Sequence, residues 1–160
     1  MPVDVTNIAV VGLGGQGVLK ASDIIADAAF RAGLDVKKSE LHGMSQRGGS
    51  VSSDIRFGRE VLSPMIPSGE VDFLVVIEGD QVEPNRHYLN SHSVMITPEI
   101  IPADALENKK SLNVALLGAL SRFLKIPDSD WQAAIRANLP EKLHDLNARA
   151  FAAGAAAAKP

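Results

Sequence analysis

The chain has 160 residues and a formal net charge of −3, with 46% of its residues hydrophobic and 22% charged. This is an ordinary globular composition, and the small negative charge gives no reason to expect a nucleic acid or an anionic membrane as a partner. The absence of cysteine excludes disulfides and any iron–sulfur cluster held by this chain. Because the apolar runs are too short to span a bilayer and the first residues do not resemble a signal peptide, we expect a cytoplasmic protein.

The first third of the chain alternates between strand and helix patterns. Residues 7–12 (NIAVVG) form a β-branched apolar run that ends at glycine, which predicts a buried parallel strand. Residues 18–33 carry apolar side chains at helical spacing, and Gly33 is placed to end that helix. Residues 34–41 (LDVKKSEL) then predict a second strand, which gives a strand–helix–strand unit.

The rest of the chain continues this pattern and ends in helices. The further predicted elements are strands at 51–58, 72–79 and 93–100, a short strand or turn at 60–70, a short helix at 82–90, and helices at 112–125, 129–139 and 140–158. Together the elements predict an α/β fold, a Rossmann-like and mainly parallel sheet with helices on both faces and a helical C-terminal third. We see no internal repeat and no domain boundary. The four histidines have no metal-ligand spacing, so we expect no metal site.

The stretch GLGGQG fits the glycine pattern GxGxxG between a predicted strand and a predicted helix. In such a turn the glycines allow tight bending and close approach of a phosphate, and the first helical N–H groups favour an anion. The candidate binding residues here are Gly12, Gly14, Gly15, Gln16 and Gly17. A tight turn without a ligand is the alternative. A dinucleotide site would also need an acidic residue at the tip of the second strand, and Glu40 is near that place.

A second unusual stretch, HGMSQRGGS, spans residues 42–50. It combines glycines with a guanidinium, an imidazole and short polar side chains, and it follows the second predicted strand, where ligands often bind in open α/β sheets. Its candidate residues are His42, Gly43, Ser45, Gln46, Arg47, Gly48, Gly49 and Ser50. We expect the two glycine-containing loops to face one crevice. An exposed flexible loop is the alternative.

Four motifs occur in an order that resembles a known family. They are GLGGQGV, ELHGMSQRGGSVSSDIRFG, SPMIPSGEVDFLVVIE and NVALLGALSRFL. In this order they resemble the gamma-type subunits of 2-oxoacid:ferredoxin oxidoreductases, and the version with HGM-x-QRGGSV is most similar to the beta subunit of the indolepyruvate enzymes. The resemblance covers about residues 5–153 and implies that residues 1–160 form one gamma-type domain.

The resemblance implies a subunit of an oxidoreductase complex that is inactive by itself. A larger partner subunit would bind thiamine diphosphate and magnesium and carry the 4Fe-4S clusters. The complex would decarboxylate an aryl 2-oxoacid oxidatively with coenzyme A and reduce ferredoxin, while the two glycine loops of this chain would complete the active-site cleft. The sequence leaves open whether coenzyme A touches this chain, which 2-oxoacid is used and whether the chain dimerises. An independent NAD(P)- or FAD-binding oxidoreductase and a regulator that binds coenzyme A or a nucleotide stay as alternatives.

Overall fold

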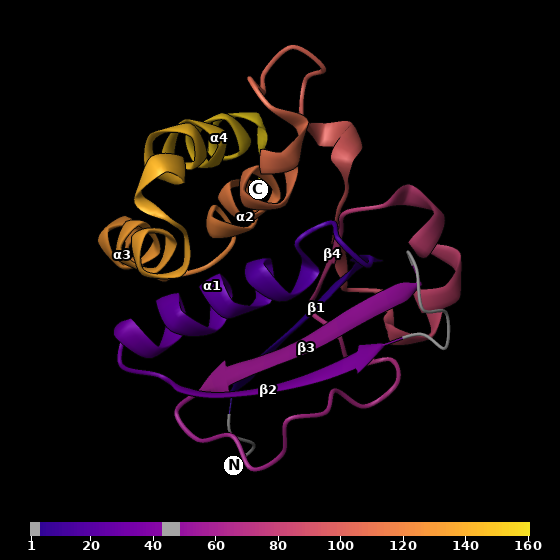
Figure 1. Ribbon diagram of the computed structural model, residues 1–160. Coiled ribbons are helices and arrows are strands. Elements are labelled where there is room, and N and C mark those ends of the chain that lie inside the picture. Colours follow the sequence, from indigo (N-terminus) through magenta and orange to yellow (C-terminus); the bar gives the residue numbers. More distant parts are fainter. Residues whose placement is uncertain (1–3, 43–48) are drawn as a thin grey trace.

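The computed structural model describes residues 4–42 and 49–160, which form a five-stranded sheet and a layer of α-helices (Figure 1). The strands are β1 (Val5–Leu13), β2 (Asp35–His42), β3 (Ser50–Gly58), β4 (Phe73–Val76) and β5 (Val94–Ile96). The α-helices are α1 (Val18–Arg31), α2 (Leu112–Ser121), α3 (Asp128–Asn138) and α4 (His144–Ala157). The 3₁₀ helices are η1 (Gly79–Gln81), η2 (Glu83–Tyr88), η3 (Pro98–Ile100), η4 (Lys109–Ser111) and η5 (Glu141–Leu143).

The strand order of the sheet is β2-β3-β1-β4-β5, and its pairing is mixed. β1, β4 and β5 pair in parallel, whereas β3 is antiparallel to both β1 and β2. β3 turns back because residues 43–49 are too few for the crossover of a dozen or more residues that parallel strands need. The predicted α/β fold and mainly parallel sheet are confirmed, since β1, β2, β4 and β5 share one direction and β3 runs the other way.

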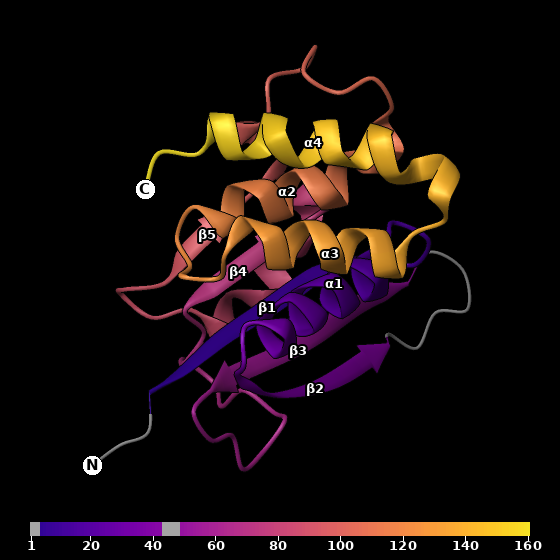
Figure 2. The ribbon, with the colours of Figure 1, turned by 90° about the vertical axis from the view of Figure 1, so that its left-hand side faces the viewer.

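The two faces of the sheet are covered differently. All four α-helices lie on one side, which we call the helical face (Figures 1 and 2). On the second face, a smaller apolar cluster forms between the sheet and the segment 59–72 together with η1 and η2. The helix predicted at 82–90 is therefore the 3₁₀ helix η2, and residues 60–70 form an irregular loop without a strand. Both faces therefore carry helical segments: the α-helices lie on the helical face, and the 3₁₀ helices η1 and η2 lie on the second face.

The helical C-terminal third confirms its prediction, and its helices α3 and α4 form a second layer outside α1 and α2. Eight of the ten residues of α2 are buried, because the helix lies between the sheet and α4. Gly118 of α2 and Gly154 of α4 lie where the two backbones touch, so that a Cβ at Gly154 would collide with the Ala115 carbonyl. Glycine at these positions allows the two helix backbones to approach more closely than larger residues would permit.

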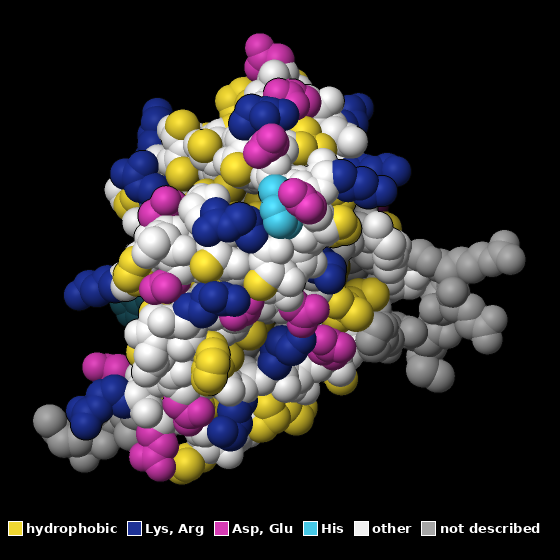
Figure 3. Space-filling model, turned by 60° about the vertical axis from the view of Figure 1, so that its left-hand side comes forward, with side chains coloured by type: hydrophobic (Ala, Val, Ile, Leu, Met, Phe, Trp, Pro, Cys, Tyr) yellow, Lys and Arg dark blue, Asp and Glu magenta, His cyan; other side chains and the backbone are white. Residues whose placement is uncertain are grey.

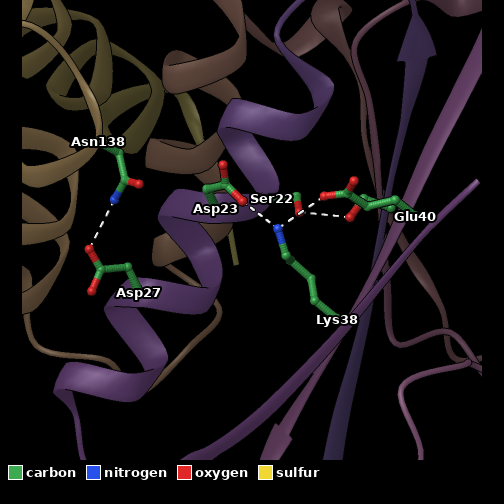
Figure 4. A network of polar contacts seen from close by, with 7 residues as sticks. Ser22, Asp23, Asp27, Lys38, Glu40 and Asn138 are labelled. Atoms are coloured by element: carbon green, nitrogen blue, oxygen red, sulfur yellow. Dashed lines mark hydrogen bonds and ion pairs between the residues drawn. The ribbon is translucent and has the colours of Figure 1, made fainter.

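Polar contacts fasten the edge strand β2 to α1, and α1 to α3 (Figure 4). The Lys38 ammonium donates to the carboxylates of Asp23 on α1 and Glu40 on β2. Asn138 on α3 donates to Asp27 on α1 at 2.9 Å. Burial acts to lower the pKa of Lys38, but the hydrogen bonds and charges of Asp23 and Glu40 outweigh it and raise that pKa. Lys38 is therefore charged at neutral pH. A charged side chain on an edge strand protects that strand from pairing with another chain.

The surface carries charges of both signs. On the side of the molecule that Figure 3 shows, basic and acidic side chains alternate over the helical layer. Within residues 4–42 and 49–160, no helix is long and apolar enough to cross a membrane.

Candidate functional site

The glycine-rich turn Gly12–Gly17 joins β1 to α1 and is closed by its own glutamine. Gln16 Oε1 accepts a hydrogen bond from the Leu13 N–H, and Gln16 Nε2 donates to the Glu78 carboxylate, both at 2.8 Å. Glu78 follows the end of β4, so that Gln16 connects the carboxyl ends of two adjacent parallel strands. Both polar ends of this predicted binding side chain are engaged within the protein, where they hold the turn in place.

The last glycine of the turn brings the amino ends of two helices together. Gly17 has a φ of 83°, and a Cβ at this position would collide with the side chain of Asn113 in the first turn of α2. Asn113 Nδ2 donates to the Gly17 carbonyl at 3.2 Å. Any side chain at residue 17 would meet both backbone strain and this collision, so glycine is required here for packing as well as for the bend.

A cleft of about 480 Å³ opens beside the turn. Its walls are Gly15, Gln16, Gly17, Ile77, Glu78, Lys109, Lys110, Leu112 and Asn113. The cleft lies at the carboxyl ends of β1 and β4, where the chain continues from β1 to one side of the sheet and from β4 to the other. In open α/β sheets, this switch point is where ligands bind.

The electrostatics of the cleft favour an anion. Lys109 and Lys110 are exposed at its rim, and the amino ends of α1 and α2 adjoin it. Neither helix has an acidic residue in its first turn, and the first amides of α1 have no side-chain cap. In α2, however, Asn113 Oδ1 accepts from the Val114 N–H, and the Leu112 N–H donates to the Lys109 carbonyl. By contrast, α3 and α4 do carry aspartates in their first turns. Free first-turn N–H groups and the positive end of a helix dipole both stabilise a negative ligand.

The two glycine loops predicted to meet do lie side by side at their described ends. The Gly14 N–H donates to the Gly49 carbonyl at 2.9 Å, and Leu13 pairs with Ser50 in the sheet. His42 ends β2 opposite Val51. The remaining predicted residues of this loop lie outside the described residues: Gly43, Ser45, Gln46, Arg47 and Gly48.

The described end of the second loop does not line the cleft with the lysines. Ser50 lines a separate hollow of about 210 Å³ together with Leu41, Ser52 and Gln81. A third hollow, of about 240 Å³, lies between the glycine turn and Val51. Ser50 and the glycine turn therefore line different hollows among the described residues, and a crevice shared by the two loops stays a prediction.

Glu40 is not placed as the acidic residue of a dinucleotide site. In that kind of site the second strand of the unit lies next to the first, but here β3 lies between β1 and β2. The Glu40 carboxylate instead accepts from Lys38 at 3.0 Å. This geometry argues against the ribose contact that a nicotinamide or flavin dinucleotide needs.

Four polar side chains of the cleft were not predicted from the sequence: Glu78, Lys109, Lys110 and Asn113. Glu78 could have been found, because it follows the most apolar predicted strand, and side chains just beyond strand ends form the sites of α/β proteins. The two lysines stand in a polar break about 90 residues after the turn and carry no local signal of their position. Only the packing of α2 against the sheet brings them to the glycine turn.

A glycine turn at the switch point of an α/β sheet, beside the uncapped amino end of α1 and two lysines, defines an α/β protein with a site suited to an anionic ligand. The family model "Pyruvate ferredoxin/flavodoxin oxidoreductase" matches residues 7–157, and the chain belongs to this family. It is 34% identical to the indolepyruvate oxidoreductase subunit IorB of Archaeoglobus fulgidus, over 92% of both chains. The corresponding subunit of Thermococcus kodakarensis is 35% identical over 96% of both chains.

Solved structures share the fold. The gamma subunit of a keto/oxoacid ferredoxin oxidoreductase from Geobacter sulfurreducens superposes with a TM-score of 0.77 at 20% identity, covering 98% of this chain and 99% of that one. A 2-oxoglutarate:ferredoxin oxidoreductase from Magnetococcus marinus, solved with 2-oxoglutarate, coenzyme A and succinyl-CoA bound, gives a TM-score of 0.83 at 22% identity. That match covers 98% of this chain and 31% of the larger one, so the fold of this protein also occurs as part of a longer polypeptide.

Proposed function

We propose that this chain is the small subunit of a thiamine diphosphate-dependent 2-oxoacid:ferredoxin oxidoreductase of the indolepyruvate type. The support is its similarity to subunits of that name over more than nine tenths of their length. The complex would convert an aryl 2-oxoacid and coenzyme A to an aryl-acetyl-CoA and carbon dioxide, with the electrons passed to ferredoxin in the cytoplasm. The observation that carries the role of this chain is the lysine-rimmed cleft at the glycine turn.

The residues of this chain do not fit the redox cofactors of such a complex. The sequence has no cysteine to bind iron, and among the residues that the structure describes no three acidic or histidine side chains are grouped to hold a metal ion. We therefore assign thiamine diphosphate, magnesium and the iron–sulfur clusters to a larger partner subunit, which would supply the decarboxylation and electron-transfer chemistry.

Coenzyme A would suit the cleft, because its phosphate groups are anions that the two lysines and the uncapped amino end of α1 would bind. Lys109 and Lys110 bring two positive charges and Glu78 one negative charge, which leaves a net charge of +1 on these side chains. The amino end of α1 adds roughly half a positive charge. In this proposal Glu78 acts through Gln16, which it holds against the turn, and the backbone of Gly15 and Gly17 allows a phosphate to come close.

The second glycine loop would extend this surface toward the larger subunit. The hydrogen bond from Gly14 to Gly49 keeps the start of that loop's return strand beside the turn. The guanidinium of Arg47 would add a bidentate contact to a phosphate or to a carboxylate of the partner. In the reconstituted complex, Arg47→Ala should raise the apparent KM for coenzyme A. Unchanged turnover and unchanged KM would remove this residue from the proposal.

The main test is calorimetric titration of coenzyme A into the assembled complex. The double variant Lys109→Ala/Lys110→Ala should weaken binding by a factor of about ten or more, which corresponds to roughly 1.4 kcal/mol per factor of ten. The control is Lys142→Ala, which removes an exposed lysine from the η5 segment away from the cleft. The affinity of the wild-type protein should also fall as salt is added, because charged contacts are screened.

Two results would contradict the proposal. Equal coenzyme A affinity in the double variant and the Lys142 control would show that the cleft does not hold the phosphates. Micromolar binding of NAD(H), NADP(H) or FAD by the isolated chain, with hydride transfer and without any partner, would instead support the independent oxidoreductase. Coenzyme A binding by a chain that never associates with a larger cluster-bearing subunit would support the regulator.

A further inference from the structure

The irregular loop of residues 61–69, which we call the proline loop, exposes apolar side chains and has no charge. Its sequence is VLSPMIPSG, so nine consecutive residues carry no ionisable side chain. Leu62 is 85% exposed and Met65 is 56% exposed. Leu62 is the most exposed of the large hydrophobic residues in the part of the chain that the structure describes. Exposed loops of soluble proteins are ordinarily polar, and apolar side chains gathered in this way mark interaction sites.

Side chains of the sheet hold the backbone of this loop on both sides of the exposed residues. Arg56 Nη1 donates to the Ser63 carbonyl at 2.9 Å and to the Met65 carbonyl at 3.3 Å. The Ile66 N–H donates to Asp54 Oδ2 at 3.1 Å. The loop is therefore fixed by bonds that reach from β3 to its tip.

Two buried residues of the loop set the direction of the exposed ones. Val61 is 2% exposed and Ile66 is 6% exposed, and the Val61 N–H donates to Asp35 Oδ2 at 2.8 Å. Because the buried residues Val61 and Ile66 anchor the loop to the protein, the side chains of Leu62 and Met65 between them point outward. Pro64 restricts the backbone further. A rigid loop loses little conformational entropy when it binds, which is a property of the anchor residues of protein interfaces.

We propose that the proline loop is a docking site for the larger subunit of the oxidoreductase, with Leu62 and Met65 inserted into an apolar depression on that subunit. This inference rests on the proposed function, which supplies the larger subunit. The absence of charge from the loop requires an apolar and uncharged partner surface. The loop leaves β3 at the end of the sheet opposite the glycine turn, so the docking site is separate from the cleft.

The size of the site favours the larger subunit over a second copy of this chain. Leu62 and Met65 offer roughly 200 Å² between them, at about 100 Å² for each side chain. A stable dimer needs about 800 Å² from each partner. The loop must therefore belong to a wider interface, such as one with a subunit that also reaches the cleft. A second copy would have to insert these residues into a different apolar surface of its neighbour, and such a head-to-tail contact extends into filaments unless it closes into a ring.

The test measures association of the purified chain with the larger subunit of the same oxidoreductase. We expect the double variant Leu62→Ser/Met65→Ser to bind at least about thirtyfold more weakly than the wild type. Leu62→Glu alone should cause a similar loss, because a charge would enter the apolar depression. The matched control is Phe30→Ser, which removes another exposed hydrophobic side chain, 71% exposed, at the end of α1. This control should bind like the wild type.

Two further readouts separate this inference from the proposed function. The isolated double variant should unfold at the temperature of the wild type, since both side chains are exposed, and should bind coenzyme A equally well. If both loop variants bind the larger subunit as tightly as the wild type, the docking site is wrong and the proposed function stands. If the wild type itself does not bind the larger subunit, the proposed function fails. If the wild type dimerises and the double variant is monomeric, a second copy occupies the loop and the inference is overturned.

Discussion

The two faces of the sheet are stabilised by different forces. On the helical face, alternate residues of β1 such as Ile8 and Val10 are fully buried under α-helices, in a large continuous apolar core. On the second face the apolar cluster is small, and the loop that covers it is tied down by polar side chains of the strands, above all Arg56 and Asp54. Burial can hold regular helices, whereas an irregular loop needs specific hydrogen bonds for its exposed backbone groups. The helical face therefore supports the cleft at the amino ends of α1 and α2, whereas the second face holds the proline loop in place.

The largest expected effect lies in the α2–α4 contact of the helical face. Gly154→Ala places a Cβ against the Ala115 carbonyl and forces the two helices apart, which should lower the free energy of unfolding by about 3 kcal/mol. Urea denaturation measures the change. Gly79→Ala is the control, because a Cβ at Gly79 meets open space, and its effect should stay within about 0.5 kcal/mol. Equal small effects of both variants would mean that the helical face does not depend on this close packing.

The second face should depend on polar contacts instead. Arg56→Ala removes hydrogen bonds to Asn7 Oδ1 and to two carbonyls of the proline loop, and should cost about 2 kcal/mol in the free energy of unfolding. Arg59→Ala, which removes an exposed arginine close by in the sequence, should cost much less. A protease that cleaves flexible segments should also cut the loop of the Arg56 variant faster than that of the control. Equal stability and equal cleavage of the two variants would contradict the comparison of the faces.

The smallest effect concerns the pH dependence of the second face. Burial raises the pKa of Asp54 above its ordinary value of 3.8, although the hydrogen bond from Ile66 and the charge of Arg56 oppose the shift. Folding therefore favours the protonated carboxyl. The stability that this group contributes is complete below the unfolded pKa and is lost as pH rises through the raised folded pKa.

Asp54→Asn keeps an oxygen that can accept from Ile66 but cannot ionise. The free energy of unfolding of the variant minus that of the wild type should therefore increase from about pH 3.8 upward and become constant above the folded pKa of Asp54. Denaturation curves of both proteins over the acidic and neutral range measure this difference. A difference that does not change with pH, or that decreases as pH rises, would contradict the raised pKa.

The local unit of β1, glycine turn and α1 was predictable, because its signals are local. An apolar β-branched run, a glycine pattern and helical spacing of apolar residues each act within a few residues of the chain. Gly33 was also readable as the end of α1: it has a φ of 89°, and the N–H groups of Gly33 and Leu34 bond back to Phe30 and Ala29. The glycines of the predicted site lie in the turn between β1 and α1 for the same reason, and their contact with a ligand stays a prediction.

Tertiary structure alone decided which distant residues meet at the turn. The amide of Asn113 reaches Gly17, and the rim lysines reach the cleft, because α2 packs on β4 and β5 with its amino end at the turn. β3 lies between β1 and β2, which places Glu40 away from the turn. The short connection after β2 makes β3 antiparallel to β2, but no local pattern predicts that β3 also pairs with β1. The sequence by itself determined the type of each main element and the bend at the glycines, since backbone geometry and side-chain periodicity are local properties. The charge and the walls of the cleft depend on contacts between segments far apart in the chain, and packing of the complete fold selects those contacts.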